Sequence, residues 1–559
     1  MIEKRVVEEL EALVSAPQVA RLLALTMQED ATEAQWDVVL TDVFWETHRE
    51  QIGALLSQLL PIEALVPEAY RTWRPLVRDA LTFLGTHLSP PRLLPKLATQ
   101  LRLPADTPLP RRVMLFIASM PGLQKIGQAI ARNPHLDPAF RTELIQLENA
   151  IQDVSPTVIR AEIDRQLGPQ LAAHDAVVHT VHLAEASVSA VVRFTWIHPQ
   201  TGTREPGVFK VLKPYVHTYF VEELQLLRQL AAYVETKRHT YTQSAIQVRE
   251  LIEDVCQLLA AETNFRQEQA NLIAATQRYA DVPGVRVPRL MQPLCTATIT
   301  AMTDEAGVKI TDAFPYAPQQ RHRVAQRLIE VLLALPLFSP QPEAVFHADP
   351  HAGNLFCDER SGDIVLFDWA LTERLSRAQR CQLLRLVAGV ALRDERLVCG
   401  ALTVLSLDNL QHDRRQVRTI HRHVSRFLRC LSPWTFPSFT DVVALLDGLA
   451  RTGYRFSSAL VVLRKVLFTL KGVLHDIAPE LRLETVFMWY IVTQGTSTAS
   501  GLSPLRRPAV TFRLPFAPSD WFRLGWSAFG FSSRVWRQSA ACLWDTVNWL
   551  GQHDPVQES

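Results

Sequence analysis

The sequence predicts an α+β fold in which a short β-rich stretch is followed by a long helical region. VHLAEASVSAVVRFTW, the turn-rich PQTGTREPG and then VFKVLKP together predict a hairpin of twisted strands from about residue 180. CTATITAM, residues 295–302, predicts one more strand. Beyond residue 312 the pattern is mostly helical as far as residue 490. Few strands before many helices predict a small β-containing N-lobe and a helical C-lobe.

The 559 residues have the composition of a globular chain, with 47% hydrophobic and 21% charged residues. The formal net charge is +1, from 58 lysines and arginines against 57 acids, so no overall field favours nucleic acid as a partner. The seven cysteines are scattered and contain no C-x-x-C pair, which indicates reduced thiols in a reducing compartment.

The first residues, MIEKRVVEELEALV, carry acids where a secretory signal needs an uninterrupted apolar stretch. No window offers 18 consecutive apolar residues. We therefore expect a cytoplasmic protein without a signal peptide or a transmembrane helix, either free in the cytoplasm or bound to the surface of a membrane.

The pattern along the chain divides it into five parts. These are a helical N-terminal region (1–100), a helical extension (101–178), the N-lobe (179–305), the helical C-lobe (306–490) and a tail (491–559). Five tryptophans recur at roughly helical intervals in the tail, which predicts either a helix docked on the body or an interfacial segment. The docked helix is favoured because such aromatic stripes usually pack into cores.

The strongest functional signal is VFHADPHAGNLF (345–356) followed by DIVLFDWA (363–370). Phosphoryl transfer needs a carboxylate near the attacking oxygen and oxygen ligands for Mg²⁺. Asp349 is the candidate base or water-positioning residue, and Asn354 and Asp368 are the candidate metal ligands. Their order and spacing, with a short hydrophobic strand predicted in DIVLFD before Asp368, match the catalytic loop and metal-binding motif of protein kinases. The sequence thus predicts a protein-kinase-like two-lobed fold that binds Mg²⁺ with ATP or ADP.

Lys210 lies in the β-rich run VFKVLKP, where a lysine between apolar residues should point toward the nucleotide. Such a lysine contacts the α- and β-phosphates and is held by a glutamate, for which Glu268 is the candidate. The alternative is that Lys213 takes this role, although it precedes Pro214 at the end of the strand.

Other segments resemble the UbiB/AarF family of atypical protein-kinase-like ATPases over about residues 112–480. The segment 123–156 is similar to the signature extension of that family, with its Lys-x-Gly-Gln core at Lys125, Gly127 and Gln128. LRKVLFTLKGVLHDIAP, residues 463–479, is similar to a C-terminal helix of the family.

LAEASVSAVVRF, residues 183–194, resembles the alanine-rich loop that replaces the Gly-rich loop of ordinary kinases. Ala186 and Ser187 are small enough to let backbone N–H groups approach phosphates closely.

The resemblance implies that Lys125 pairs with Glu262 of a Glu-x-Asp motif, so that the extension plugs the peptide cleft. It further implies an ATPase or small-molecule kinase that supports the biosynthesis of ubiquinone or another isoprenoid lipid. Implied partners are a nucleotide, an isoprenoid lipid or quinone precursor and an anionic membrane surface; proteins could bind the N-terminal helices.

Three residues depart from the family pattern. Asn264 replaces the second carboxylate of Glu-x-Asp, Ala370 replaces the glycine after Asp368, and Glu185 stands in the alanine-rich loop, where an inward-pointing acid would weaken nucleotide binding. Because Ala disfavours φ > 0, we expect restricted flipping at residue 370. Because of these departures, the alternative is a pseudokinase that binds nucleotide and serves as a scaffold. A true protein kinase is less favoured, because the extension should block the access of peptides to the cleft.

Two further patterns have a structural and a functional interpretation. His347 and His351 flank Asp349, but a zinc site lacks another ligand at tetrahedral spacing. The arginine-rich stretch 412–430 predicts a helix whose basic face is either simply solvated or binds anionic lipid head groups.

Overall fold

The computed structural model describes six main ranges, with short gaps inside them, and a few isolated positions before residue 66. The ranges are 66–131, 154–241, 248–312, 318–407, 414–431 and 437–490. Most of the expected N-terminal helices, residues 132–153 of the signature segment and the tryptophan-rich tail from 491 lie outside the described residues.

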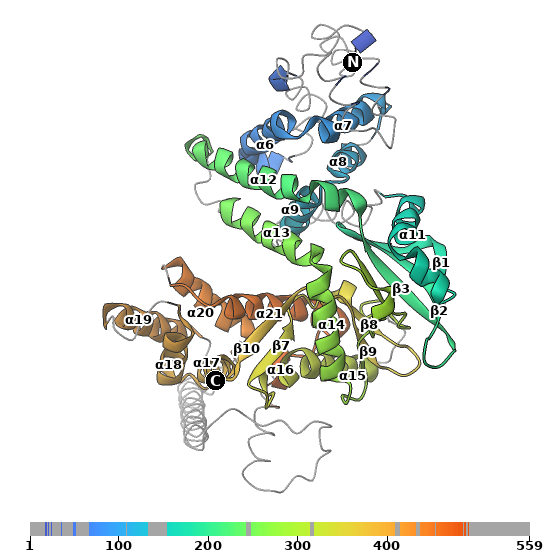
Figure 1. The fold of residues 1–559 in the computed structure, drawn as a ribbon. Coiled ribbons are helices and arrows are strands. Elements are labelled where there is room, and N and C mark those ends of the chain that lie inside the picture. Colours follow the sequence, from blue (N-terminus) through green and yellow to red (C-terminus); the bar gives the residue numbers. More distant parts are fainter. Residues whose placement is uncertain are drawn as a thin grey trace, which may run out of the picture. The chain divides into compact units, whose positions relative to one another are not determined.

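The chain divides into two compact units (Figure 1). The first consists of Met1–Gln269 with Leu290–Asp304, and the second of Ala270–Arg289 with Glu305–Ser559. Helix α14 (Phe265–Tyr279) begins in the first unit and ends in the second. The predicted fold class, α+β and kinase-like, agrees with this mixture of helices and mainly antiparallel strands.

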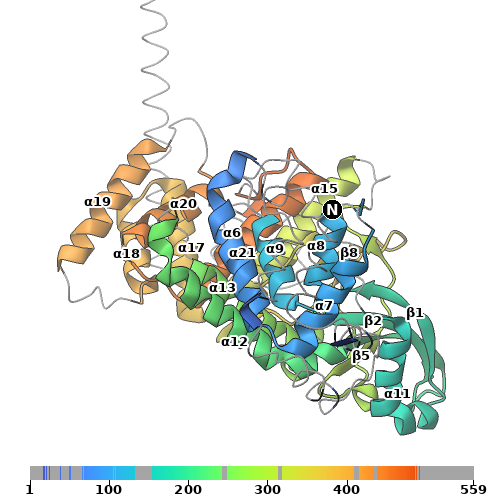
Figure 2. The same cartoon turned by 90° about the horizontal axis from the view of Figure 1, so that it is seen from above.

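The first unit contains helices before and after a four-stranded antiparallel sheet. The helices are η1 (Glu68–Trp73), α6 (Arg74–His87), α7 (Pro90–Arg102), α8 (Leu109–Ile117), α9 (Pro121–Ala131), α11 (Pro156–Ala173), α12 (Pro214–Thr236), η2 (Arg238–Thr240), α13 (Val248–Thr263) and η3 (Gln292–Leu294). Helices α12 and α13 run side by side in both views (Figure 1 and Figure 2). Their apolar faces, with Leu226, Leu230 and Leu259, form a buried core together with α6–α9.

The sheet of the first unit has the order β1-β2-β3-β5. Its strands are β1 (Val177–Glu185), β2 (Ser189–Ile197), β3 (Arg204–Leu212) and β5 (Ile299–Thr303). The expected hairpin is β2–β3, in which Lys210 lies opposite Val191, and the strand expected at 295–302 is β5, in which Thr300 lies opposite Lys210. One face of this sheet packs against α11 through buried aliphatic and aromatic residues.

The second unit is mainly helical, with two small sheets. The helices are α15 (Pro318–Ile329), η4 (Glu330–Ala334), α16 (Leu335–Leu337), η5 (Ala352–Asn354), α17 (Arg377–Leu392), α18 (Glu395–Leu405), α19 (Arg414–Cys430), α20 (Phe439–Arg451) and α21 (Ser458–Ile477). The strands are β4 (Val285–Arg286), β6 (Val308–Lys309), β7 (Glu343–His347), β8 (Leu355–Cys357), β9 (Ile364–Leu366) and β10 (Thr372–Ser376). One sheet has the order β4-β9-β8-β6 and the other pairs β7 with β10.

These short strands position the strongest sequence motif. Strand β7 ends at His347, immediately before Asp349, and the hairpin β8–β9 separates Asn354 from Asp368. Residues 343–376 therefore contain four strands inside a region whose pattern predicts mostly helix. Within the described parts of the chain, no helix is long and apolar enough to cross a membrane.

Candidate functional site

Lys210 and Glu268 form an ion pair in the first unit. Lys210 Nζ lies 2.6 Å from Glu268 Oε1, and both side chains are nearly inaccessible. The lysine comes from β3 and the glutamate from the first turn of α14. The ammonium also lies 5.6 Å from the centre of the Phe265 ring. The contact expected between Lys210 and Glu268 is present, and the lysine is held in one place.

Lys213, the alternative to Lys210, has a different partner. It is fully buried, and its Nζ lies 2.8 Å from Glu185 Oε1. A second basic group, His182 Nδ1, lies 3.5 Å from Glu185 Oε2. The carboxylate of Glu185 is therefore directed to a buried lysine, which offsets its negative charge.

The loop between β1 and β2 contains the two small residues expected near phosphates. Ala186 is exposed, and its N–H donates a hydrogen bond to the carbonyl oxygen of Ser189. Ser187 is buried, and its carbonyl accepts a hydrogen bond from Tyr215 Oη. Ala186 is thus the exposed residue of this loop, and the Ser187 hydroxyl does not form its surface.

The signature extension contacts α13 through the pair expected from the resemblance. Lys125 Nζ, on α9, lies 2.7 Å from Glu262 Oε1, and both side chains are mostly buried. A Cβ at Gly127 would meet no heavy atom within 4 Å among the described residues. Gln128 lies on the same helix, but its side chain is outside the described part of the chain.

Asn264, which replaces the second carboxylate of Glu-x-Asp, caps α14. Its Oδ1 accepts a hydrogen bond from the N–H of Gln267 at 3.1 Å, and its carbonyl accepts one from the N–H of Glu268. Asn and Asp are similarly good N-cap residues, because both offer a short side-chain oxygen to the first free N–H groups. The amide therefore preserves the start of the helix that carries Glu268.

The loop after β7 holds Asp349 and Asn354 together in the second unit. Asn354 Nδ2 donates to the carbonyl oxygen of Asp349 at 3.1 Å, and the N–H of Asn354 donates to the carbonyl of His351. The carbonyl of Asn354 in turn accepts from the N–H of Phe367, next to Asp368. This chain of bonds joins the candidate base to both candidate metal ligands.

Asp368 follows β9 and has a left-handed backbone conformation, with φ of 53°. Its side chain is exposed, and its Oδ1 accepts a hydrogen bond from the N–H of Ala370 at 3.1 Å. Aspartate tolerates this conformation better than most residues, because its short side chain can bond the local backbone. Ala370 itself is not among the residues with positive φ, so the alanine sits there without the strain that a left-handed conformation would impose.

His347 joins the loop that contains Asp349 to the segment that precedes Asp368. Its Nε2 lies 2.9 Å from the carbonyl oxygen of Phe367, and its Nδ1 lies 3.3 Å from the amide nitrogen of Asp349. A carbonyl needs a donor and an N–H needs an acceptor, which fixes the neutral tautomer with its proton on Nε2. Burial lowers the pKa of His347, consistent with this neutral form. Because both ring nitrogens are engaged, the zinc interpretation of His-x-Asp-x-His has no support from His347.

Two contacts at this site were not expected from the sequence. Lys465 Nζ, on α21, lies 3.1 Å from Asp349 Oδ1. Asn271 Nδ2, on α14, donates to the carbonyl oxygen of Trp369 at 3.0 Å. The signal for Lys465 was present in the segment 463–479, which resembles a family helix, whereas no spacing rule pointed to Asn271.

Residues 146–401 match the family model of the ABC1 atypical kinase-like domain. Over these residues the chain is similar to that domain, and we refer to residues 146–401 as the ABC1 domain. The resemblance predicted from the motifs is thereby confirmed, as is the kinase-like fold class. Lys210, Glu268 and the loop with Asp349 lie inside the ABC1 match, whereas Lys125 and Lys465 lie outside it.

Several curated relatives support the same family. The "Uncharacterized protein sll1770" of Synechocystis sp. is 24% identical over 69% of this chain and 64% of its own length. A "Probable protein kinase UbiB" of Cellvibrio japonicus is 26% identical over 64% of each chain. The "Protein ACTIVITY OF BC1 COMPLEX KINASE 7, chloroplastic" of Arabidopsis thaliana is 25% identical over 64% of this chain and 50% of its own. In these three pairs the match spans less than two thirds of the relative.

Among solved structures, the Rv3197–erythromycin complex from Mycobacterium tuberculosis is similar to this chain. The sequence identity is 15% and the TM-score is 0.41, over 65% of this chain and 89% of the other.

Proposed function

We propose that the ABC1 domain binds Mg²⁺ with ATP or ADP and acts as a slow ATPase or as a kinase for a small molecule. The observation that carries this proposal concerns two groups of residues, those expected to bind the phosphates and those expected to bind the metal. Within each group the side chains or backbones are in contact. Lys210 is paired with Glu268 in the first unit, and Asp349, Asn354 and Asp368 are linked through one hydrogen-bond chain in the second.

In this proposal Lys210 contacts the α- and β-phosphates, and Glu268 keeps its ammonium in position. The backbone around Ala186 covers the phosphates, as a tight turn of N–H groups does in other phosphate-binding loops. The buried Lys213 offsets the charge of Glu185, so the acid in this loop does not repel the nucleotide.

The residues proposed as metal ligands fit a hard cation. Mg²⁺ takes oxygen ligands, and it would neutralise part of the phosphate charge. Asn354 uses its amide nitrogen to bond Asp349, so its amide oxygen is the atom suited to a metal. Asp368 supplies an exposed carboxylate on a backbone whose conformation is fixed by the bond to Ala370.

Asp349 is proposed to orient the attacking water or hydroxyl group and to accept its proton. The oxygen of that group forms a bond to the γ-phosphorus while the bond from this phosphorus to the ADP oxygen breaks, and the proton then passes from the carboxyl group to solvent. Asp349→Asn should abolish hydrolysis and leave nucleotide binding largely intact. Hydrolysis by this variant at the wild-type rate would exclude the assignment.

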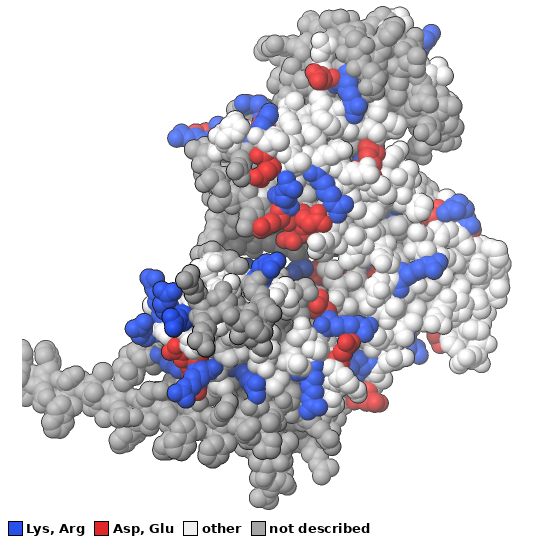
Figure 3. All heavy atoms as spheres, turned by 60° about the vertical axis from the view of Figure 1, so that its left-hand side comes forward, with Lys and Arg blue, Asp and Glu red and all other residues white. Residues whose placement is uncertain are grey.

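The proposed context is the biosynthesis of ubiquinone or another isoprenoid lipid, which relatives named UbiB suggest. Helix α19 exposes Arg418, Arg422, Arg426 and Arg429. On the face drawn in Figure 3, basic and acidic side chains occupy neighbouring positions. Because the formal net charge is only +1, we assign the attraction to anionic lipid to the exposed arginines of α19. Salt-sensitive binding to anionic liposomes is the expected result, and α19 variants should weaken it.

A second candidate is a nucleotide-binding pseudokinase scaffold for a lipid-biosynthesis complex. The changes at Asn264 and Ala370 favour it, and tight nucleotide binding with negligible turnover would support it. A protein kinase is the third candidate, and robust phosphorylation of a generic protein substrate would support that one.

A thermal-shift titration tests the proposed nucleotide site, because a ligand that binds only the native state raises the apparent stability. Wild type, Asp368→Asn and Glu359→Gln are titrated with ADP and with ATP, with and without Mg²⁺. Glu359 is the matched control, since it is an exposed acid in the β8–β9 turn. We expect nucleotide to raise the melting temperature of wild type and Glu359→Gln in a Mg²⁺-dependent way, and Asp368→Asn to lack this increase. No increase in wild type would refute nucleotide binding.

A further inference from the structure

The carboxylate of Asp349 has a basic neighbour near each oxygen. Lys465 Nζ lies 3.1 Å from Oδ1, and His351 Nε2 lies 3.9 Å from Oδ2. The lysine is the nearer of the two, and it forms an ion pair with the carboxylate. The Asp349 side chain is mostly buried, whereas the Lys465 side chain is 39% exposed. Of these two basic groups, the ammonium of Lys465 is therefore the one that pairs closely with the carboxylate.

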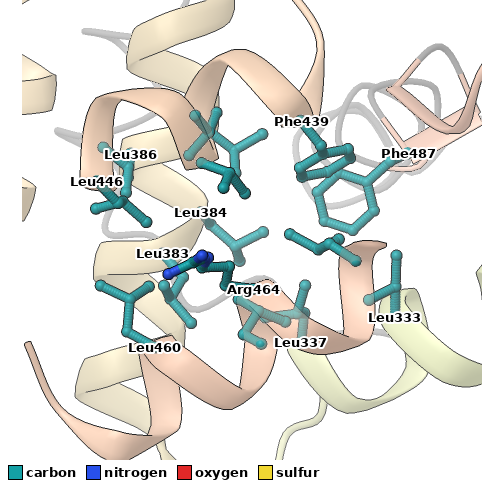
Figure 4. A pocket seen from close by; sticks show the side chains of 15 residues that line it. Leu333, Leu337, Leu383, Leu384, Leu386, Phe439, Leu446, Leu460, Arg464 and Phe487 are labelled. Atoms are coloured by element: carbon teal, nitrogen blue, oxygen red, sulfur yellow. The ribbon is translucent and has the colours of Figure 1, made fainter. Parts of the chain in front are cut away.

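Lys465 comes from a helix that is firmly packed. Helix α21 buries Val466, Leu470 and Leu474 and contacts β10, the strand paired with β7. Its residues Leu460 and Arg464 also line a cavity of about 30 Å³ between α21, α17 and α20 (Figure 4). That volume is too small for a nucleotide or a lipid, and the almost wholly apolar lining offers a water molecule few partners. Packing on this side fixes the helix, and with it the position from which Lys465 reaches Asp349.

The catalytic loop has no lysine or arginine of its own. Residues 345–356 read VFHADPHAGNLF, in which the histidines are the only basic side chains. The positive charge beside Asp349 is thus supplied by a helix that lies beyond residue 401, where the match to the ABC1 domain ends. A helix outside the matched residues consequently completes the surroundings of the candidate base.

We infer that Lys465 is a positioning residue of the active site and that it holds the Asp349 carboxylate in the orientation needed for phosphoryl transfer. This inference rests on the proposed function. It adds that turnover depends on α21, whereas nucleotide binding does not, since the residues proposed to bind nucleotide and metal lie elsewhere. Orientation of a reacting group matters strongly for rate, and a small misplacement is enough to slow a reaction about 100-fold.

The kinetic test compares Lys465→Met, Lys465→Arg and Lys471→Met in the full chain. Lys471 is the matched control, because it lies on the same helix and donates to Thr440 Oγ1 instead. Lys465→Met should lower kcat for ATP hydrolysis by about 10- to 100-fold and leave KM for ATP and the Mg²⁺-dependent thermal shift unchanged. Lys465→Arg should restore most of kcat, since it keeps a positive charge within reach. Equal kcat values for Lys465→Met and Lys471→Met would overturn the inference.

A second measurement tests the contact between Lys465 and Asp349 without measuring ATP hydrolysis. Amine acylation followed by peptide mass spectrometry gives the labelling rate of each lysine in wild type and in Asp349→Asn. The loss of the carboxylate should speed labelling of Lys465 several-fold and leave Lys471 unchanged. An unchanged rate at Lys465 would overturn the inference even if ATP is hydrolysed.

The two proposals fail in different ways. If wild type shows no nucleotide-dependent thermal shift, the proposed function fails whatever the labelling rates are. If wild type binds nucleotide and labels as expected but has no measurable turnover, the positioning role is overturned and the nucleotide site stands.

Discussion

Asn271 Nδ2 donates a hydrogen bond to the carbonyl oxygen of Trp369 at 3.0 Å, and both residues are buried. Asn271 lies three residues after Glu268 on α14, and Trp369 directly follows Asp368. One helix therefore carries both the partner of Lys210 and the group that anchors the segment with the proposed metal ligand. The Trp369 ring adds to this anchor by packing near Tyr279 and His347.

Replacing Asn271 should disturb the metal segment more than the rest of the fold. In Asn271→Leu the buried carbonyl of Trp369 loses its donor, which costs about 1–3 kcal/mol of stability. We expect a lower free energy of unfolding in urea and a smaller Mg²⁺-dependent nucleotide shift. Gln277→Leu, at an exposed position of the same helix, is the control. If ATP with Mg²⁺ raised the melting temperature of both variants equally, the hydrogen bond of Asn271 would have no effect on nucleotide binding.

The pair of Lys213 and Glu185 should behave as a buried ion pair. Both side chains are almost inaccessible, so Lys213→Met leaves the buried Glu185 carboxylate without its lysine and should lower the free energy of unfolding by about 3–5 kcal/mol. The double variant Lys213→Met/Glu185→Leu removes that charge and should recover most of the loss. Urea unfolding of wild type, both single variants and the double variant measures the coupling. A double variant no more stable than Lys213→Met would contradict this account.

Motif spacing led to the right partners where both residues stand in a recognisable pattern. The kinase-like motifs pointed to the contact of Lys210 with Glu268, and the resemblance to the UbiB/AarF family pointed to that of Lys125 with Glu262; both contacts are present. The contacts of Lys213 and Lys465 could not be foreseen from spacing, since their partners depend on how distant segments pack.

Local conformation was harder to predict than partners. Of the strands between residues 343 and 376, the one in DIVLFD was predicted and is present as β9. The others are three to five residues long, and apolar runs of that length do not distinguish strand from buried helix. The left-handed residue of the metal segment is Asp368, although glycine preference had drawn attention to position 370. Aspartate can stabilise this conformation through its own side chain, but the sequence does not show which aspartates do so.

Cys295 gives a pH dependence with a defined sign. Burial raises the pKa of its thiol to about 11 from the ordinary value of 9.0. The folded state therefore holds the proton more tightly than the unfolded state. The resulting stability is complete below pH 9 and is lost as the pH rises toward 11, by at most about 3 kcal/mol.

The rate of alkylation reports directly on the raised pKa of the Cys295 thiol. The thiolate is the reactive form, so iodoacetamide should modify Cys295 at pH 8 far more slowly than the exposed Cys430. In urea the two rates should become similar. Rapid alkylation of Cys295 in the native protein would show that the thiol is accessible and that its pKa is not raised.

The contact between Lys125 and Glu262 should hold the signature extension on α13. The side chains are 12% and 16% exposed, so the pair is only weakly screened by solvent and Lys125→Glu places two like charges together. We expect this variant to be less stable and the exchanged pair, Lys125→Glu/Glu262→Lys, to regain most of the loss. If the extension also excludes peptides, Lys125→Glu should phosphorylate a generic protein substrate faster than wild type does, and the exchanged pair should not. Stability that recovers in the exchanged pair without any change in protein phosphorylation would assign the contact a structural role alone.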